Sequence, residues 1–219
     1  MAAKVEKIDA AEPEEELLEQ AAGLIKRGKV VVCPTDTGYA FSANALDPGA
    51  VLRVFKLKGR SYANPIHVAV DSVEAAGRYA CWNESAGLLA RRFLPGALTL
   101  VLPRKDTVPD LLVGGRDTIG IRIPDNRVML RLAALTGLPL TATSANISGQ
   151  PTPYSVAEIK KQMGEAMKKV AMVLDQGPLE TRDLSTIVDL TVSPPQLIRQ
   201  GRISWLEIRQ LLKAQTAPE

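Results

Sequence analysis

The chain has 219 residues, of which 46% are hydrophobic and 23% charged, and its formal net charge is +3. This length and composition are typical of a soluble globular protein that buries its own core, and the weak basic bias suits anionic ligands without indicating a nucleic-acid-binding protein. The chain has two cysteines, Cys33 and Cys81, and one histidine, His67. Two cysteines cannot form a disulfide framework, and a zinc site would have to use mostly carboxylate ligands.

Helix and strand signals alternate along most of the chain. Residues 1–12 predict a flexible tail, and one domain is expected from residue 13 to 214. Predicted helices cover 13–27, 47–58, 71–80, 83–93, 126–136 and a segment starting at 204, where caps or a first-turn proline precede apolar stripes. Predicted strands cover 29–33, 65–70, 97–102, 118–123, 139–143, 170–175, 186–190 and 196–199. This alternation predicts a single α/β domain with one central mixed sheet flanked by helices.

No segment of the sequence suggests export or membrane insertion. The first twenty residues are acidic and lack the apolar core of a signal peptide. No apolar run approaches the ~20 residues that a membrane helix needs. We therefore expect a cytoplasmic protein with no membrane contact and with reduced cysteines.

Familiar nucleotide-binding and hydrolase motifs are absent or misplaced. Residues 23–29 fit the spacing GxxxxGK, but Val30 replaces the serine or threonine, and a helix precedes a strand where a phosphate-binding loop needs the reverse order. GxGxxG and GxSxG do not occur, so a dinucleotide site and a serine hydrolase lack support. The loops after predicted strands instead collect Thr, Ser, Asn, Lys and Arg. Such groups suit reactions that neutralise charge and align reactants, including nucleotidyl transfer.

Six short segments carry these polar residues and together support a family assignment. They are Pro34-Thr35-Asp36-Thr37 with Tyr39, Lys58-Gly59-Arg60 with Asn64-Pro65, Thr118–Pro124, Thr143-Ser144-Ala145-Asn146 with Ser148-Gly149, Ser185–Asp189 and Leu197–Gly201. In this order and spacing they resemble the YrdC family, the threonylcarbamoyl-AMP synthases, over roughly residues 21–204. The resemblance implies a twisted YrdC-like sheet with a concave, basic face. It also implies an enzyme that converts L-threonine, bicarbonate and ATP into L-threonylcarbamoyl-AMP and pyrophosphate.

The same resemblance implies roles for individual residues. The catalytic set is Lys58, Arg60, Ser144 and Asn146; the threonine-binding set is Thr35, Thr37, His67, Thr118 and Arg122; the nucleotide-binding set is Lys58, Asn64, Ser144, Asn146, Ser185 and Arg199. The planar fork of arginine suits the threonine carboxylate, whereas lysine acts as a mobile point charge. Mg²⁺ would enter with ATP, since no dedicated carboxylate cage is visible. A downstream tRNA threonylcarbamoyl transferase complex would use the product.

The chain departs from the family pattern near its histidine. The family often carries histidine where this chain has Ala69, whereas His67 lies two residues earlier. Residues two apart on a strand share a face, so we predict that His67 reaches the same pocket from about 7 Å further along. Gly38, Ala40 and Phe41 replace the family's usual valine, glycine and leucine around Tyr39, which leaves the choice between threonine and serine open.

Each polar segment by itself also fits a simpler structural role. Lys58 and Arg60 fit a solvated helix end, Ser144 and Asn146 a turn, and Arg122 an exposed strand face. Two other functions also stay open: a YrdC-like carbamoyltransferase that uses carbamoyl phosphate, and a non-enzymatic module that binds double-stranded RNA. The net charge of +3 is low for such a module, so we expect only weak RNA binding.

Overall fold

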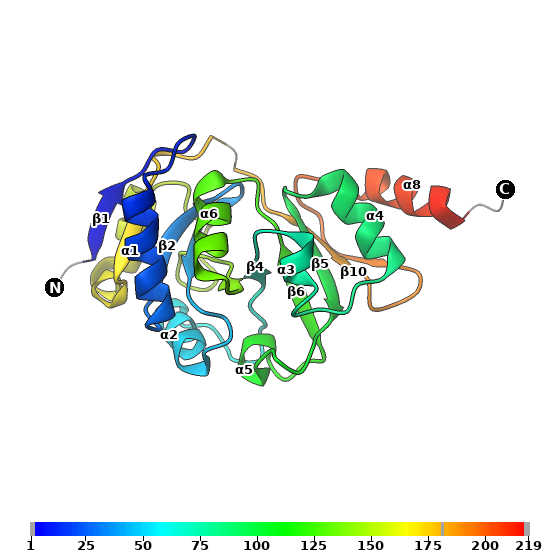
Figure 1. Ribbon diagram of the computed structural model, residues 1–219, viewed down its shortest axis with the longest axis horizontal. Helices are drawn as coiled ribbons and strands as arrows, with labels where there is room; N and C mark the ends of the chain where they lie inside the picture. Colours follow the sequence, from blue (N-terminus) through cyan, green and yellow to red (C-terminus); the bar gives the residue numbers. More distant parts are fainter. Residues whose placement is uncertain (1–2, 181, 217–219) are drawn as a thin grey trace.

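Two mixed β-sheets form the frame of the protein in the computed structural model, which describes residues 3–180 and 182–216 (Figure 1). The five-stranded sheet has the order β1 (Lys4–Lys7), β9 (Met172–Asp175), β2 (Val31–Thr35), β3 (Gly38–Ser42), β8 (Thr143–Ser144). The six-stranded sheet has the order β11 (Gln196–Arg199), β10 (Thr186–Asp189), β5 (Leu98–Pro103), β6 (Thr118–Arg122), β4 (Val68–Ala69), β7 (Leu140–Thr141). The sequence predicts one mixed sheet, so the division into two is a correction.

Eight α-helices and one 3₁₀-helix are present among the described residues. They are α1 (Glu15–Lys26), α2 (Pro48–Lys58), α3 (Val73–Ala76), α4 (Glu84–Phe93), α5 (Asp110–Val113), α6 (Arg127–Thr136), α7 (Val156–Met163), the 3₁₀-helix η1 (Gly164–Lys169) and α8 (Trp205–Thr216). Asn126 and Asn83 lie where the predicted helices begin, and each accepts a hydrogen bond from a backbone N–H in the first turn. For α3 the cap is Ser72, one residue after the predicted start at Asp71. None of the described helices is long and apolar enough to cross a membrane.

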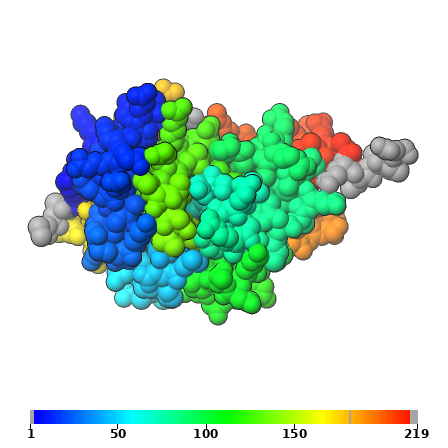
Figure 2. Space-filling view, viewed as in Figure 1, coloured from blue at the N-terminus to red at the C-terminus, as the bar shows by residue number. Residues whose placement is uncertain are grey.

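Helices α1 and α6 lie side by side and cover one face of the five-stranded sheet (Figure 1). Their apolar stripes, which include Leu18, Ile25 and Leu132, pack in one buried cluster with Val31 of β2 and Leu174 of β9. Figure 2 shows the side chains of α1 (dark blue) and α6 (yellow-green) forming one continuous surface on this side. This packing fixes the end of β2, from which the candidate site begins.

The chain passes from one sheet to the other within a few residues. Strand β7 pairs with β4 of the six-stranded sheet, and β8, which begins two residues later, pairs with β3 of the five-stranded sheet. Between them, the backbone N–H of Ala142 donates to the carbonyl of His67 at 2.8 Å. The two sheets are therefore held together beside His67.

Several segments differ from the sequence prediction. Helix α5 is unpredicted, and the helix predicted over 71–80 is the shorter α3. The tail predicted over residues 1–12 contains β1, which pairs in parallel with β9. The loop predicted after residue 33 is a tight hairpin, because β2 continues through Thr35 and Gly38 pairs with it to begin β3. Helix α7 is unpredicted, although Ser155 caps it by accepting from the backbone N–H of Glu158. That Ser-x-x-Glu spacing is a recognisable helix-start signal in the sequence.

Candidate functional site

A polar cavity opens at the junction of the two sheets. Eight of the twelve predicted site residues line it, namely Thr35, Thr37, Arg60, His67, Arg122, Ser144, Ser185 and Arg199. They come from the β2–β3 hairpin, the segment before β4, the end of β6, strand β8 and the two strands at the far edge of the second sheet. Residues far apart in the sequence therefore share one cavity, and three of them are arginines.

Lys58 lies behind the cavity wall. Its side chain is 1% exposed, and Nζ donates to the carbonyls of Ser144 and Asn146 and, at 2.7 Å, to Asn146 Oδ1. Burial, followed by the charge of Arg60, lowers the pKa of Lys58 to about 7. The three oxygen acceptors favour the ammonium form, because only that form supplies three N–H donors. The sequence predicts a phosphate-binding ammonium here, whereas Lys58 in this structure anchors a loop.

Asn146 is the hub of that loop. Its Oδ1 accepts from Lys58 and from Ser144 Oγ, and its amide nitrogen donates to the carbonyls of Gln150 and Pro151. The side-chain polar atoms of Asn146 are therefore engaged by the protein, and its predicted direct role toward substrate stays a prediction. Of the predicted Ser–Asn pair, Ser144 is the member that reaches the cavity.

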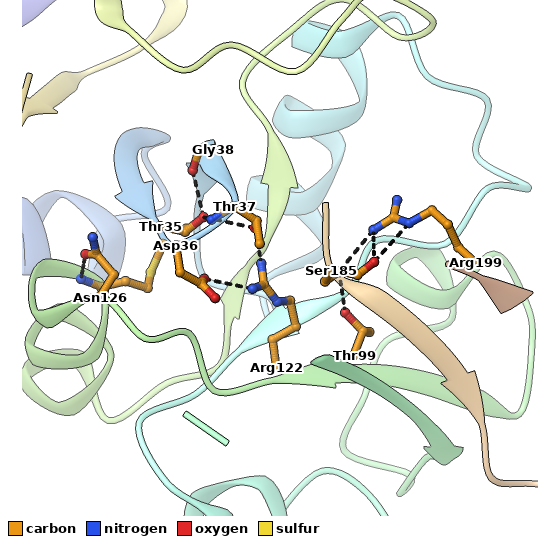
Figure 3. A network of polar contacts seen from close by, with 10 residues as sticks. Thr35, Asp36, Thr37, Gly38, Thr99, Arg122, Asn126, Ser185 and Arg199 are labelled. Carbon is orange, nitrogen blue, oxygen red and sulfur yellow. Dashed lines mark hydrogen bonds and ion pairs between the residues drawn. The ribbon is translucent and has the colours of Figure 1, made fainter. Parts of the chain in front are cut away.

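Arg60 and Arg199 present charge to the cavity without a carboxylate partner among the ion pairs of the described residues. Arg60 donates to the carbonyls of Asn64 and Pro65. Arg199 donates to the carbonyl and hydroxyl of Ser185, whose Oγ also lies 2.9 Å from Thr99 Oγ1 (Figure 3). Neutral partners fix these guanidiniums in place and leave their positive charge available to an anion.

Arg122 is held differently from the other two arginines. Its Nη1 donates to Thr37 Oγ1 at 2.7 Å, and its Nη2 forms an ion pair with Asp36 Oδ1 at 2.8 Å (Figure 3). Thr35 Oγ1 accepts from the backbone N–H of Thr37 and donates to the carbonyl of Gly38, which fixes the turn that carries both partners. The end of β6 is therefore joined to the β2–β3 hairpin by this arginine.

A family model for Sua5, YciO and YrdC, described as telomere recombination, matches residues 23–201. The chain belongs to this family. A Sua5/YciO/YrdC relative from Pyrococcus abyssi, named threonylcarbamoyl-AMP synthase, is 41% identical over 88% of this chain and 56% of its own length. A relative from Methanocaldococcus jannaschii is 40% identical over 88% of this chain and 89% of its own length.

The fold agrees with that of solved members of the Sua5/YciO/YrdC family. The structure of P. abyssi Sua5 complexed with L-threonine matches with a TM-score of 0.90 and 39% identity, covering 95% of this chain and 60% of that one. The chain thus covers 56% of the curated P. abyssi relative and 60% of the solved P. abyssi chain. The predicted family is confirmed, as is the predicted α/β domain apart from its division into two sheets.

His67 occupies the cavity at the point where this chain departs from the usual Sua5/YciO/YrdC pattern. Its ring lies against Gly120, where a Cβ would come within 2.4 Å of His67 Cδ2, so only glycine leaves room for it. Ala69, at the family's usual histidine position, is fully buried in β4 and pairs with Arg122. Burial and the positive charges of Arg199, Arg122 and Arg60 lower the pKa of His67 to about 3. The imidazole is therefore neutral at physiological pH.

This neutral histidine predicts a specific pH dependence of stability. The unfolded chain binds a proton at His67 near pH 6.5, but the folded chain binds it only near pH 3, so acid favours unfolding as the pH falls below 6.5. With allowance for partial exposure, wild-type protein should lose about 1–2 kcal/mol more than His67→Gln between pH 7 and pH 5. Urea unfolding at both pH values measures the difference. Equal losses in the two proteins would contradict a depressed pKa.

The remaining predicted residues lie outside the cavity. Thr118 opens β6 opposite Pro103, four residues and roughly 13 Å of strand from Arg122. Asn64 is exposed and takes part through its backbone carbonyl, which accepts from Arg60. For Thr118 the reason is the length of β6, whose two ends lie too far apart to line the same part of one cavity.

Three contributing residues received no role from the sequence. Asp36 lies within the Pro-Thr-Asp-Thr segment, and Thr99 is a polar residue inside an apolar strand. Each position is therefore a weak indication in the sequence of a role in the site. Thr152 lines the cavity over Gly38, where a Cβ would lie 2.5 Å from the threonine Cγ2. Nothing in the local sequence around Thr152 indicates this contact, which depends on the loop fixed by Asn146.

Proposed function

We propose that this protein makes L-threonylcarbamoyl-AMP and pyrophosphate from L-threonine, bicarbonate and ATP. The observation that carries the proposal is the convergence of Arg60, Arg122 and Arg199 on one hydroxyl-lined cavity. The relatives support it, because those from Pyrococcus abyssi, Bacillus subtilis and mouse are named threonylcarbamoyl-AMP synthase at 35–41% identity. The same names favour this reaction over the carbamoyltransferase and the RNA-binding module.

Threonine would bind at the Arg122 end of the cavity. A guanidinium and two hydroxyls, those of Thr35 and Thr37, suit a carboxylate and its neighbouring polar groups. His67 would accept a hydrogen bond from the amino acid as a neutral imidazole, which avoids adding a fourth positive charge near the substrate amine. The amine binds as the charged end of the zwitterion and must lose its proton before it attacks bicarbonate, a loss that the positive charges of Arg60 and Arg199 favour.

The chemistry brings two anions together. The threonine nitrogen bonds to the carbon of bicarbonate with loss of water, giving a carbamate. A carbamate oxygen then bonds to the α-phosphorus of ATP while the bond to the β-phosphate oxygen breaks and pyrophosphate leaves. Arg60 and Arg199 would neutralise the charge on carbamate and phosphates, with Ser185 as a hydrogen-bond donor and with Ser144, whose hydroxyl donates to Asn146 Oδ1, as an acceptor in the cavity lining. Lys58 and Asn146 would act through Ser144, whose loop they hold.

The nucleoside part of ATP would need space beyond the cavity, and an adjoining surface groove provides it. A groove of about 830 Å³ shares Thr152 and Leu184 with the cavity and is also lined by Pro151 and Tyr154. The nucleoside would lie along this apolar wall. The described residues contain no group of three or more His, Cys, Asp or Glu that could hold a metal ion, so Mg²⁺ would enter bound to the ATP phosphates.

We place the protein, by the same proposal, in the cytoplasm ahead of a tRNA threonylcarbamoyl transferase complex. Threonylcarbamoyl-AMP is a mixed anhydride that hydrolyses readily, so a downstream enzyme must take up the acyl group soon after release. Any direct RNA contact would be weak, since the net charge is only +3.

Pyrophosphate release from ATP tests the proposal. We expect release that requires both L-threonine and bicarbonate, with loss of more than nine-tenths of the rate when either is omitted. Carbamoyl phosphate should not replace bicarbonate. Release that is independent of threonine, or that is supported by carbamoyl phosphate, would refute the assignment.

A further inference from the structure

Asp36 lies just outside the cavity but is bonded to a residue inside it. It occupies the turn between β2 and β3, and its side chain is 6% exposed, while that of its ion-pair partner Arg122 is 7% exposed. Asp36 is not among the residues that line the cavity, whereas Arg122 is. Any effect of Asp36 on a ligand there must therefore pass through Arg122.

The pairing of these two residues is incomplete. Asp36 Oδ1 accepts from Arg122 Nη2, but Asp36 Oδ2 and Arg122 Nε are both buried and without a hydrogen-bond partner. The strongest carboxylate–guanidinium geometry uses two parallel hydrogen bonds. A contact that served only to join the sheets would be expected to use both, since unpaired buried polar atoms are costly. The guanidinium is instead turned so that Nη1 meets Thr37 at the cavity wall.

Charge balance separates Arg122 from the other cavity arginines. Arg60 and Arg199 have carbonyl and hydroxyl partners and keep their net positive charge. Arg122 is neutralised by Asp36 at 2.8 Å. An unbalanced arginine suits phosphate or carbamate, whereas a balanced one suits the carboxylate of a zwitterion, which brings its own positive charge on the α-amine.

We propose that Asp36 is a positioning residue for recognition of the amino-acid substrate. It orients the Arg122 guanidinium toward the cavity and balances its charge, so that this end of the site takes a zwitterionic amino acid and the Arg60–Arg199 end takes the phosphates. This inference rests on the proposed function, because it names the part of the site that selects the amino acid.

Michaelis constants measured by pyrophosphate release test the inference. Asp36→Asn keeps the shape and one oxygen acceptor but removes the charge, and Asp36→Ala removes both. We expect the Michaelis constant for L-threonine to rise about 10-fold in the first variant and about 100-fold in the second, with that for ATP unchanged within twofold. Asp125→Asn makes the same chemical change at an exposed carboxylate in the neighbouring depression and should alter neither constant.

The outcomes are distinguishable. If wild-type protein shows no threonine-dependent release, the proposed function itself fails. If wild-type is active and Asp36→Asn leaves the threonine constant unchanged or lowers it, the positioning role is wrong. Equal increases in the threonine and ATP constants would assign Asp36 a general structural role and overturn the inference. Should Asp36→Ala fail to fold, the isosteric Asn variant decides.

Discussion

Replacing Lys58 by methionine should lower the rate of pyrophosphate release at least 100-fold, although Lys58 does not line the cavity. Methionine fills a similar volume but leaves the carbonyls of Ser144 and Asn146 without this donor, and Asn146 Oδ1 keeps only Ser144 Oγ as a donor. Each buried acceptor left unpaired costs about 1–3 kcal/mol, partly offset by removal of a buried charge, so we expect a net loss of about 2–3 kcal/mol in stability. A displacement of Ser144 by even ~1 Å accounts for the loss of rate.

Lys56→Met is the matched control for this experiment. Lys56 lies on the same helix, two residues away, but is exposed and should tolerate the change with normal activity and stability. Urea unfolding measures the stability, and pyrophosphate release the activity, of wild-type protein, Lys58→Met and Lys56→Met. A Lys58→Met protein with activity within threefold of wild-type would show that the loop does not need the ammonium.

The second large effect is expected at Arg122. Arg122→Met removes the guanidinium and leaves the Asp36 carboxylate buried without its counter-ion. Breaking a buried ion pair from one side costs about 3–5 kcal/mol, so the unfolding free energy should fall by an amount in that range. The loss of a charge-assisted contact to the substrate carboxylate should reduce kcat/KM for threonine about 1,000-fold.

A double variant separates these two consequences. In Arg122→Met combined with Asp36→Asn neither member of this buried ion pair carries a charge. Most of the lost stability should therefore return, while kcat/KM for threonine stays low. Arg131→Met is the surface control: its ion pair with Glu15 is about half exposed on both sides and should contribute less than about 1 kcal/mol. Recovery of activity together with stability in the double variant would mean that Arg122 has only a structural role.

The site depends on the place where the two sheets meet. Strand β8 brings Ser144 to the five-stranded sheet, and β6 brings Arg122 from the six-stranded one. The crossing at Ala142 and the bond between Asp36 and Arg122 hold these two groups in the lining of one cavity. A single continuous sheet would place the same residues along one surface. The division into two sheets therefore lets residues from both sheets line one cavity.

The sequence by itself determined the family, several helix starts and most of the cavity. Short-range signals are sufficient for these features, because a cap such as Asn126 or the buried run of β2 depends on residues within a few positions of one another. The motif residues Arg60, Arg122, Ser144 and Arg199 are also polar groups in loops or at strand ends, where such groups are seldom needed for packing.

Only the tertiary structure decided which of these groups line the cavity. Lys58 and Asn146 look equivalent to Arg60 and Ser144 in the sequence, yet they bond to each other across 88 positions and are buried behind the wall. Strand β1 forms because β9 offers a parallel edge, which no signal within Lys4–Lys7 reveals. The physical reason is common to these cases. A long-range hydrogen bond or ion pair depends on how distant elements pack, so the sequence around either partner does not predict it.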